Sequence, residues 1–235
     1  MAGAGSRFLN AGYIKPKFLL KRNSRETILD VIFKNIHSEN VEFYAICNNV
    51  NKLWITKDLI RKNSALNKIK LIFINETRGQ AESLNLGLCH LLNKKIVTEK
   101  TPFITHNIDT ILLQRKIDSL FSMLNRCDGI IDSFISRSKN FSYVKLNKYK
   151  NVTSLMEKKV VSNRASSGLY GFSSIKKYIN FYQKIDSNEK KEKYISQVIN
   201  LMIKDGLIFK DCMNNKAENT VVLGTPKEYE KYTSK

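Results

Sequence analysis

The sequence lacks the features that mark membrane-spanning and secreted proteins. None of its 235 residues belongs to an apolar run near the ~20 residues that a membrane helix needs. No segment has the ordered basic, apolar and small-residue zones of a signal peptide. We therefore expect a protein without a membrane span that is located in the cytoplasm.

Cysteine and histidine are sparse, which argues against two kinds of site. The cysteines form no Cys-x-x-Cys pair and have no histidine at ligand spacing, so neither a metal cluster nor a disulfide framework is expected. His106 lacks an accompanying serine or cysteine nucleophile motif, so we assign it a structural role. The four cysteines are Cys47, Cys89, Cys127 and Cys212.

Acidic residues are few relative to basic ones. There are 40 Lys and Arg against 21 Asp and Glu, a net charge of +19. Such a balance raises the question of a nucleic-acid partner, but no recognisable nucleic-acid module accompanies it and the lysines are scattered among Asn and Ile. We expect no specific nucleic-acid partner, although the positive field favours encounter with small phosphorylated substrates.

The first half of the chain alternates segments with helical and strand-like spacing of apolar residues. A hydrophobic content of 42% is enough for a substantial core, and without internal repeats or a linker we expect one domain over residues 1–235. Ser24 is the expected N-cap of the first helix. The alternation predicts an α/β fold of Rossmann-like, three-layer α/β/α type with a mainly parallel central sheet. The expected helices are 24–36, 53–60 and 80–92, and the expected strands are 41–47, 69–74 and 102–106.

The second half begins with strand-like runs that have little helix between them. This pattern predicts a small antiparallel insertion in the fold. Two further helices are expected after it, around 175–185 and 190–204. The expected strands are 130–135, 143–146, 152–156 and 169–172.

Two local patterns point to phosphate chemistry. The chain opens with Gly3 and Gly5, then Ser6 and Arg7; glycines let backbone N–H groups approach an anion closely, and the guanidinium adds charge. Asp109 follows a buried strand-like run, at the edge where open α/β sheets bind ligands. Mg²⁺ often takes only one or two carboxylates, so we expect Asp109 to be a magnesium ligand.

A collinear series of short motifs resembles the sugar-phosphate nucleotidyltransferase family over almost the whole chain. The resemblance implies that a phosphate oxygen of the acceptor attacks the α-phosphorus of a nucleoside triphosphate, which releases pyrophosphate. It also implies a role in supplying surface-polysaccharide precursors. The motifs are Met1–Phe8, Lys15-Pro16-Lys17, Asn107-Ile108-Asp109, Met156-Glu157-Lys158, Ser167-Gly168-Leu169-Tyr170 and Leu223-Gly224-Thr225-Pro226.

The resemblance implies a role for each motif. Arg7 faces the departing end of the triphosphate, Lys17 lies beside the α-phosphate, and Asp109 binds Mg²⁺. The nucleotide is held by the backbone of Ala2, Gly3, Ala4, Gly5 and Ser6 and, at the nucleobase, by Gly79 and Gln80. The phosphorylated sugar, or a similar small acceptor, is held by Glu157, Lys158, Ser167, Gly168 and Tyr170.

The chain departs from the family pattern at two places. The family often has a second acidic metal ligand where this chain has Val222, so another carboxylate, such as Asp211 or Glu218, has to replace it or catalysis is altered. The family also threads a hydrophobic strand into the sheet before the glycine loop, whereas nothing precedes Met1 here. We expect that this first strand, before Gly3, is missing because the start is truncated.

Two other functions stay open. The segment 78–88, followed by a strand-end aspartate, is similar to metal-dependent glycosyltransferases that use nucleoside-diphosphate sugars, although these prefer paired acids at the metal. The second is a noncatalytic nucleotide or sugar-phosphate binding protein, which Val222 favours. The sequence leaves the base, the acceptor and the oligomeric state undetermined.

Overall fold

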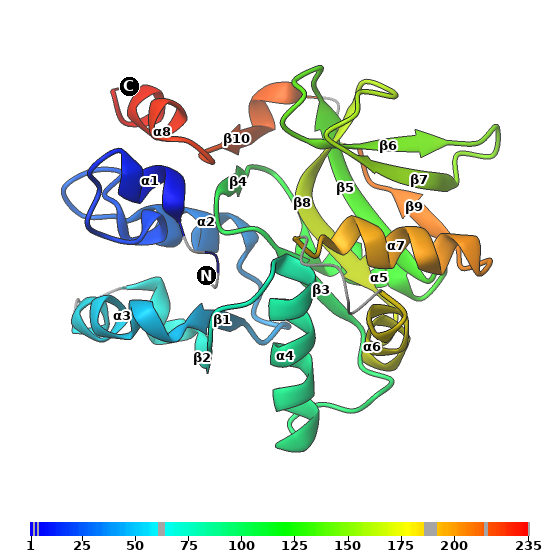
Figure 1. The fold of residues 1–235 in the computed structure, drawn as a ribbon, viewed down its shortest axis with the longest axis horizontal. Coiled ribbons are helices and arrows are strands. Elements are labelled where there is room, and N and C mark those ends of the chain that lie inside the picture. Colours follow the sequence, from blue (N-terminus) through cyan, green and yellow to red (C-terminus); the bar gives the residue numbers. More distant parts are fainter. Residues whose placement is uncertain (2, 4, 61–63, 186–191, 214–215, 235) are drawn as a thin grey trace. The chain divides into compact units, whose positions relative to one another are not determined.

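The computed structural model describes residues 1, 3, 5–60, 64–185, 192–213 and 216–234. The chain divides into two compact units, and each mixes helices with strands (Figure 1). The α/β fold class is therefore confirmed, whereas a single domain stays a prediction. None of the described helices is long and apolar enough to cross a membrane. Unit 1 contains Met1–Thr77, Asn107–Ile117 and Asn219–Lys235; unit 2 contains Arg78–His106 and Asp118–Glu218.

Unit 1 is built around helix α2 (Ile28–Ile36), which contributes to two hydrophobic clusters. The helix begins after Thr27 and not after Ser24, so the predicted N-cap was wrong. Thr27 and Asp30 form a capping box, and the second carboxylate oxygen of Asp30 accepts a hydrogen bond from the Ala65 N–H at 2.7 Å. A reciprocal cap satisfies two backbone donors at once, which explains why the helix begins here.

Two small sheets complete the frame of unit 1. Strands β1 (Tyr44–Asn48) and β2 (Lys70–Ile74) are parallel, with α3 (Lys52–Leu59) between them in the chain. Strands β4 (Thr110–Leu112) and β10 (Thr220–Val222) are antiparallel. The remaining helices of unit 1 are α1 (Ser6–Asn10), α8 (Pro226–Thr233) and the 3₁₀ helices η1 (Lys17–Leu19), η2 (Asn49–Asn51) and η3 (Ala65–Lys68).

Unit 2 contains a mixed sheet in which β8 is paired on both sides. Strand β8 (Arg164–Phe172) runs antiparallel to β3 (Phe103–His106) and to β5 (Gly129–Ile135), and β5 is parallel to β9 (Phe209–Asp211). The antiparallel pair β6 (Ser142–Leu146) and β7 (Val152–Glu157) extends the sheet beyond β8. The antiparallel segment predicted after residue 128 is confirmed.

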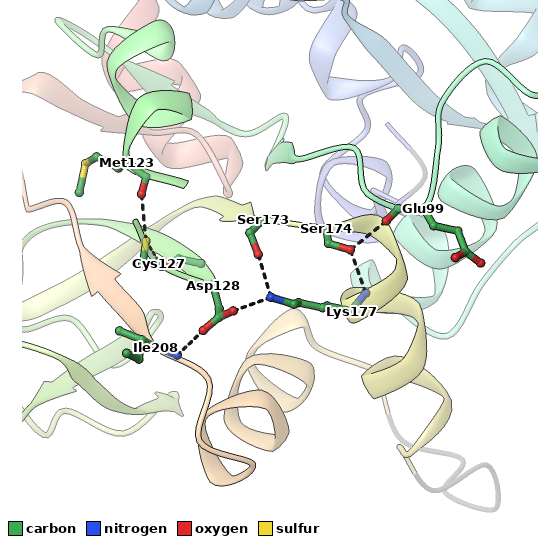
Figure 2. Close-up of polar contacts among 9 residues, drawn as sticks. Glu99, Met123, Cys127, Asp128, Ser173, Ser174, Lys177 and Ile208 are labelled. Atoms are coloured by element: carbon green, nitrogen blue, oxygen red, sulfur yellow. Dashed lines mark hydrogen bonds and ion pairs between the residues drawn. The ribbon is translucent and has the colours of Figure 1, made fainter. Parts of the chain in front are cut away.

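The helices of unit 2 are α4 (Gln80–Asn93), α5 (Ile117–Leu124), α6 (Ile175–Gln183) and α7 (Ile195–Lys204). The carboxylate of Asp128 joins three of the unit's elements (Figure 2). It accepts hydrogen bonds from Lys177 Nζ on α6 at 2.6 Å and from the Ile208 N–H, next to β9, at 2.9 Å. The Asp128 carbonyl also accepts from the Ser173 N–H, directly after β8, at 2.9 Å. The ends of β5, β8 and β9 are thereby fixed to α6.

Candidate active site

The glycine-rich start of the chain turns directly into helix α1. Gly5 has φ +67°, a left-handed conformation that favours glycine, and its carbonyl accepts hydrogen bonds from the N–H groups of Phe8 and Leu9. Phe8 is buried, whereas Ser6 and Arg7 are exposed. Arg7 and Ser6 are therefore accessible at the start of the helix. Gly3 is exposed, and the predicted nucleotide contacts at Ala2 and Ala4 lie outside the described residues.

Lys17 and Asp109 form an ion pair in unit 1 although they are 92 residues apart. The Lys17 Nζ lies 2.7 Å from Asp109 Oδ2, and the two side chains are 23% and 28% exposed. Two of the three predicted catalytic residues are thus in direct contact. Asp109 lies three residues beyond β3, as its predicted place after a strand requires, and immediately before β4.

Gly224 lies beside the Asp109 carboxylate. A Cβ placed on Gly224 would lie 3.9 Å from Asp109 Oδ2 and 3.7 Å from Glu228 Oε2, so the two carboxylates approach the same glycine. The Leu223 N–H also donates to the Asp109 carbonyl at 2.7 Å, which extends the β4–β10 ladder to this point. The Gly-Thr-Pro motif therefore adjoins the Lys17–Asp109 pair.

One hydrophobic cluster fixes these motifs in unit 1. Its buried members include Phe8 from α1, Leu20 after η1, Ile111 from β4 and Leu223 after β10, and Ile108 packs against it. Each of these apolar residues is a near neighbour in sequence of a predicted site residue. Because these apolar side chains are buried together, the predicted site residues next to them in sequence are held in the same region of unit 1.

The donor set around Asp109 suits a magnesium ion that also binds phosphates. The carboxylate is partly exposed, and a hard cation with one or two carboxylates completes its shell with phosphate oxygens and water. Val222 pairs with Thr110 across the β4–β10 ladder, so β10 brings no carboxylate to Asp109. Among the described residues, no group of three or more His, Cys, Asp or Glu is placed to hold a metal ion.

Asp211 and Glu218 were expected to serve in place of the acidic residue that the family often has where this chain has Val222. The structure shows the environment of each carboxylate. Asp211 belongs to unit 2, where its side chain is 2% exposed and accepts from Arg164 Nη1 at 2.5 Å and from Ser133 Oγ at 2.6 Å. Glu218 is exposed in the last turn before β10. The carboxylate that approaches Gly224, Glu228, was not predicted. Its sequence signal is a capping box with proline at the first helical position, Thr225-Pro226-Lys227-Glu228.

Gly79 and Gln80 begin helix α4 in unit 2. Gly79 has φ +143°, and a Cβ there would lie 2.6 Å from the carbonyl oxygen of Lys193. The backbones of the two segments are joined by hydrogen bonds from the Ala81 N–H to the Lys193 carbonyl and from the Lys193 N–H to the Arg78 carbonyl. The close approach of the Lys193 backbone is enough to explain why residue 79 is glycine, and no contact with a nucleobase is needed for that explanation. Gln80 is exposed, and its predicted contact with the base stays a prediction.

The predicted acceptor residues lie on or next to β7 and β8, two strands of the unit 2 sheet that are separated by β6. Glu157, at the end of β7, accepts hydrogen bonds from Ser142 and Ser196. Tyr170 on β8 is buried and its hydroxyl accepts from Ser166 Oγ at 2.9 Å. Burial raises the pKa of Tyr170 to about 12, so its hydroxyl keeps its proton at neutral pH.

Ser167 and Gly168 form an irregularity in β8. Between the pairs Ile131–Tyr170 and Ser133–Ser166, β8 contains three residues where β5 contains one, and Gly168 has φ +84°. Bulges of this kind change the direction in which side chains point and are frequent near functional sites.

Lys158 follows β7 and is exposed. Its Nζ donates to the Tyr194 hydroxyl at 3.2 Å, and this hydrogen bond raises the pKa of the ammonium group. The Tyr194 hydroxyl in turn donates to Glu192 Oε2 at 2.5 Å. Lys158 is therefore held as a cation beside β7. Tyr194, Ser142 and Ser196 carry no sequence signal that singles them out.

The protein has an α/β fold, a glycine-rich segment that leads into a helix at Arg7, and a lysine–aspartate pair beside the Gly-Thr-Pro turn. These features are typical of proteins that bind nucleotides. The comparisons with known proteins make this class specific. The chain belongs to the nucleotidyl transferase family, whose family model matches residues 1–230. Among curated proteins, none matches the sequence significantly.

Solved structures of similar fold carry related descriptions. A nucleoside-diphosphate-sugar pyrophosphorylase from Vibrio cholerae RC9 is 26% identical, with a TM-score of 0.84 over 100% of this chain and 98% of the other. A putative glucose-1-phosphate thymidylyltransferase from Bacillus anthracis is 13% identical, with a TM-score of 0.77 over 99% and 91%. HddC from Yersinia pseudotuberculosis is 17% identical, with a TM-score of 0.66 over 93% and 89%. The predicted family and fold class are thereby confirmed.

Proposed function

We propose that the protein transfers a nucleoside monophosphate from a nucleoside triphosphate to a sugar phosphate and thereby supplies surface-polysaccharide precursors. A phosphate oxygen of the sugar phosphate forms a bond to the α-phosphorus. The bond from that phosphorus to the oxygen bridging to the β-phosphorus breaks, and pyrophosphate leaves with the electron pair. The ion pair of Lys17 and Asp109 beside Gly224, in a chain of the nucleotidyl transferase family, carries this proposal.

The reaction brings one anion to another, so fixed positive charge is the main requirement. Lys17 neutralises the α-phosphate as negative charge develops there, and Arg7 neutralises the departing pyrophosphate. The backbone N–H groups of Gly3, Gly5 and Ser6 orient the phosphates. Asp109 would hold a magnesium ion, and such an ion would supply further charge neutralisation for the phosphates.

The acceptor is held by unit 2 in this proposal. Lys158, an exposed cation fixed by Tyr194, binds the acceptor's phosphate. Glu157 and the hydroxyls around it, together with the irregular stretch at Ser167 and Gly168, offer hydrogen bonds to sugar hydroxyls. A network of carboxylate and hydroxyl groups suits a polyhydroxylated acceptor better than an apolar one.

The test is a matrix of the five common nucleoside triphosphates against hexose and heptose 1-phosphates with Mg²⁺, followed by release of pyrophosphate and by ³¹P NMR of the nucleoside-diphosphate sugar. One productive pair is expected to release pyrophosphate and sugar nucleotide in equal amounts. Absence of both products from every pair would contradict the proposal.

Val222 favours a second candidate, a protein that binds nucleotide without turnover, because valine removes a carboxylate that the family often uses. Isothermal titration of the same triphosphates distinguishes the two functions. Tight binding of a triphosphate with no pyrophosphate from any acceptor would favour the binding protein.

A further inference from the structure

Helix α3 in unit 1 and the residues that flank it expose three aliphatic side chains on the side away from the core. Ile55 is fully buried in the core cluster of unit 1. Leu53 and Ile60 lie on the opposite side of the helix, two turns apart, and Val50 precedes Leu53 by one turn. These three side chains are 75% (Val50), 62% (Leu53) and 82% (Ile60) exposed. Exposed Thr56 and Lys57 lie between Leu53 and Ile60 on this side, so the surface combines aliphatic with polar and basic side chains.

Three lysines lie on α3 or beside its Trp54. Lys52 and Lys57 are on α3 itself; Lys57 Nζ lies 5.5 Å and Lys15 Nζ lies 5.9 Å from the centre of the Trp54 ring. The single acidic residue of α3, Asp58, accepts a hydrogen bond from Ser64 Oγ at 2.7 Å. We call Val50, Leu53, Ile60 and the three lysines the α3 surface.

We propose that the α3 surface docks the protein on an anionic lipid bilayer. Aliphatic side chains enter the boundary between headgroups and acyl chains, while lysines pair with anionic headgroups at the same depth. The chain's net charge of +19 attracts it to such a membrane from a distance. Trp54 is partly buried against the core cluster that contains Ile55, and two of the lysines lie near its ring; tryptophan is the kind of side chain that settles at a membrane interface.

Charge and chemistry favour a bilayer over other occupants. A second copy of the chain would bring the three lysines of one copy against those of another, which is unfavourable. A nucleic acid would engage the lysines, but its phosphates offer nothing to three aliphatic side chains. A bilayer with anionic headgroups satisfies both parts of the surface.

Trp54 is the only tryptophan in the chain, so its fluorescence reports on this surface alone. The full-length protein is mixed with phosphatidylglycerol vesicles or phosphatidylcholine vesicles at low and at high salt. We expect cosedimentation and a blue shift of Trp54 emission with phosphatidylglycerol only, weakened by salt. Brominated acyl chains should quench Trp54 in the wild-type protein, a measurement that needs no variant.

A charge-neutral triple variant, Val50→Gln, Leu53→Gln and Ile60→Gln, tests the aliphatic part. We expect its partition coefficient to fall about tenfold or more, because the buried apolar area is lost. The matched control replaces three exposed aliphatic residues elsewhere, Leu9→Gln, Leu86→Gln and Ile208→Gln, and should partition as the wild type does. Both variants keep the charge of +19. Their circular dichroism and unfolding midpoints verify the fold.

Three results would overturn the proposal. The first is that phosphatidylglycerol vesicles bind no more protein than phosphatidylcholine vesicles. The second is that both triple variants bind equally, which would assign binding to basicity alone. The third is that sedimentation equilibrium without lipid shows a dimer that the α3 triple variant abolishes, which would make a second copy the occupant.

Discussion

At the scale of single residues, Lys17 and Asp109 are the pair on which the chemistry depends. Lys17→Met and Asp109→Asn should each lower pyrophosphate release by about 10²- to 10³-fold, because the first removes a preorganised positive charge and the second removes the carboxylate that would hold Mg²⁺. Steady-state assays of the productive substrate pair measure the effect. Lys21→Met is the matched control, an exposed lysine four residues along the chain that should keep full activity. Full activity in both site variants would refute their roles.

The same ion pair makes a prediction about cation binding that does not need turnover. Lys17 Nζ lies 2.7 Å from Asp109 Oδ2, so a metal ion that binds this carboxylate has to compete with the Lys17 ammonium group. Lys17→Met should therefore bind Mn²⁺ roughly three- to tenfold more tightly in the absence of nucleotide, because a repelling charge is removed. Asp109→Asn should bind it more weakly.

Electron paramagnetic resonance of free Mn²⁺ measures both affinities, with Lys21→Met as the reference. Equal Mn²⁺ affinity in Lys17→Met and the wild type would show that Lys17 does not compete for the carboxylate. This result would leave the transfer reaction itself untouched, since turnover is measured separately.

At the scale of elements, the contacts of Asp128 predict how the stability of unit 2 depends on pH. Burial of Asp128 raises the pKa of its carboxyl, but the hydrogen bonds from Lys177 and the Ile208 N–H outweigh burial, so the net pKa lies below the ordinary value of 3.8. A lowered folded-state pKa contributes stability that is present above the unfolded pKa. This contribution is lost as the pH falls through the folded pKa.

Asp128→Asn should therefore lower the free energy of unfolding by about 1–2 kcal/mol at pH 7, the lower part of the range for hydrogen bonds to charged groups, because the Lys177 side chain is 44% exposed. The difference from the wild type should begin to shrink as the pH falls below the ordinary pKa of 3.8 and be lost once the pH lies below the folded-state pKa. Urea unfolding followed at several pH values measures it. Lys177→Met should behave in the same way as Asp128→Asn.

The neighbouring Lys176 provides the control for this prediction. Lys176 pairs with Glu99 at 2.7 Å, but both side chains are well exposed (58% and 59%), and such pairs contribute little. Lys176→Met should leave the unfolding midpoint nearly unchanged at every pH. A loss as large as that of Lys177→Met would mean that lysine in general, and not the contact with Asp128, stabilises this part of unit 2.

The elements also show what could be predicted from the sequence. Helix α4 was predicted to within one residue because its apolar spacing is regular, whereas the start of α2 was misplaced because Ser24 was preferred to the capping box of Thr27 and Asp30. Strands β4, β9 and β10 have three residues each and were missed. Strands this short have no periodicity of their own, and their existence depends on partners that are distant in sequence.

The candidate site likewise contains features that the sequence predicts and features that depend on the fold. Lys17 was selected by resemblance, and Asp109 by its place after a strand-like run as well. No local rule predicts that side chains 92 residues apart form a pair. The expectation for Gly79 rested on close approach to a ligand, yet the backbone of Lys193 makes that approach. Glu228 was predictable as a capping residue from its spacing to Thr225. Its proximity to Gly224 and Asp109 depends on how β10 pairs with β4.

At the scale of the whole molecule, the charge of +19 predicts how salt affects the reaction. Both substrates are polyanions, so the field of the protein raises their local concentration, and salt screens that field. Raising KCl from about 0.05 M to about 0.5 M should lower kcat/KM by roughly tenfold while kcat changes little, because steering acts before the complex forms.

The variant Lys17→Met separates this field from the site. It changes one of 40 basic residues, so its kcat/KM should decline with salt at the same slope as that of the wild type, from a much lower starting value. Sucrose at matched viscosity controls for diffusion. A slope that disappears in Lys17→Met would assign the salt effect to one contact at the phosphate. A wild-type kcat/KM that is constant across the salt range would show that the excess of lysine does not steer the substrates at all.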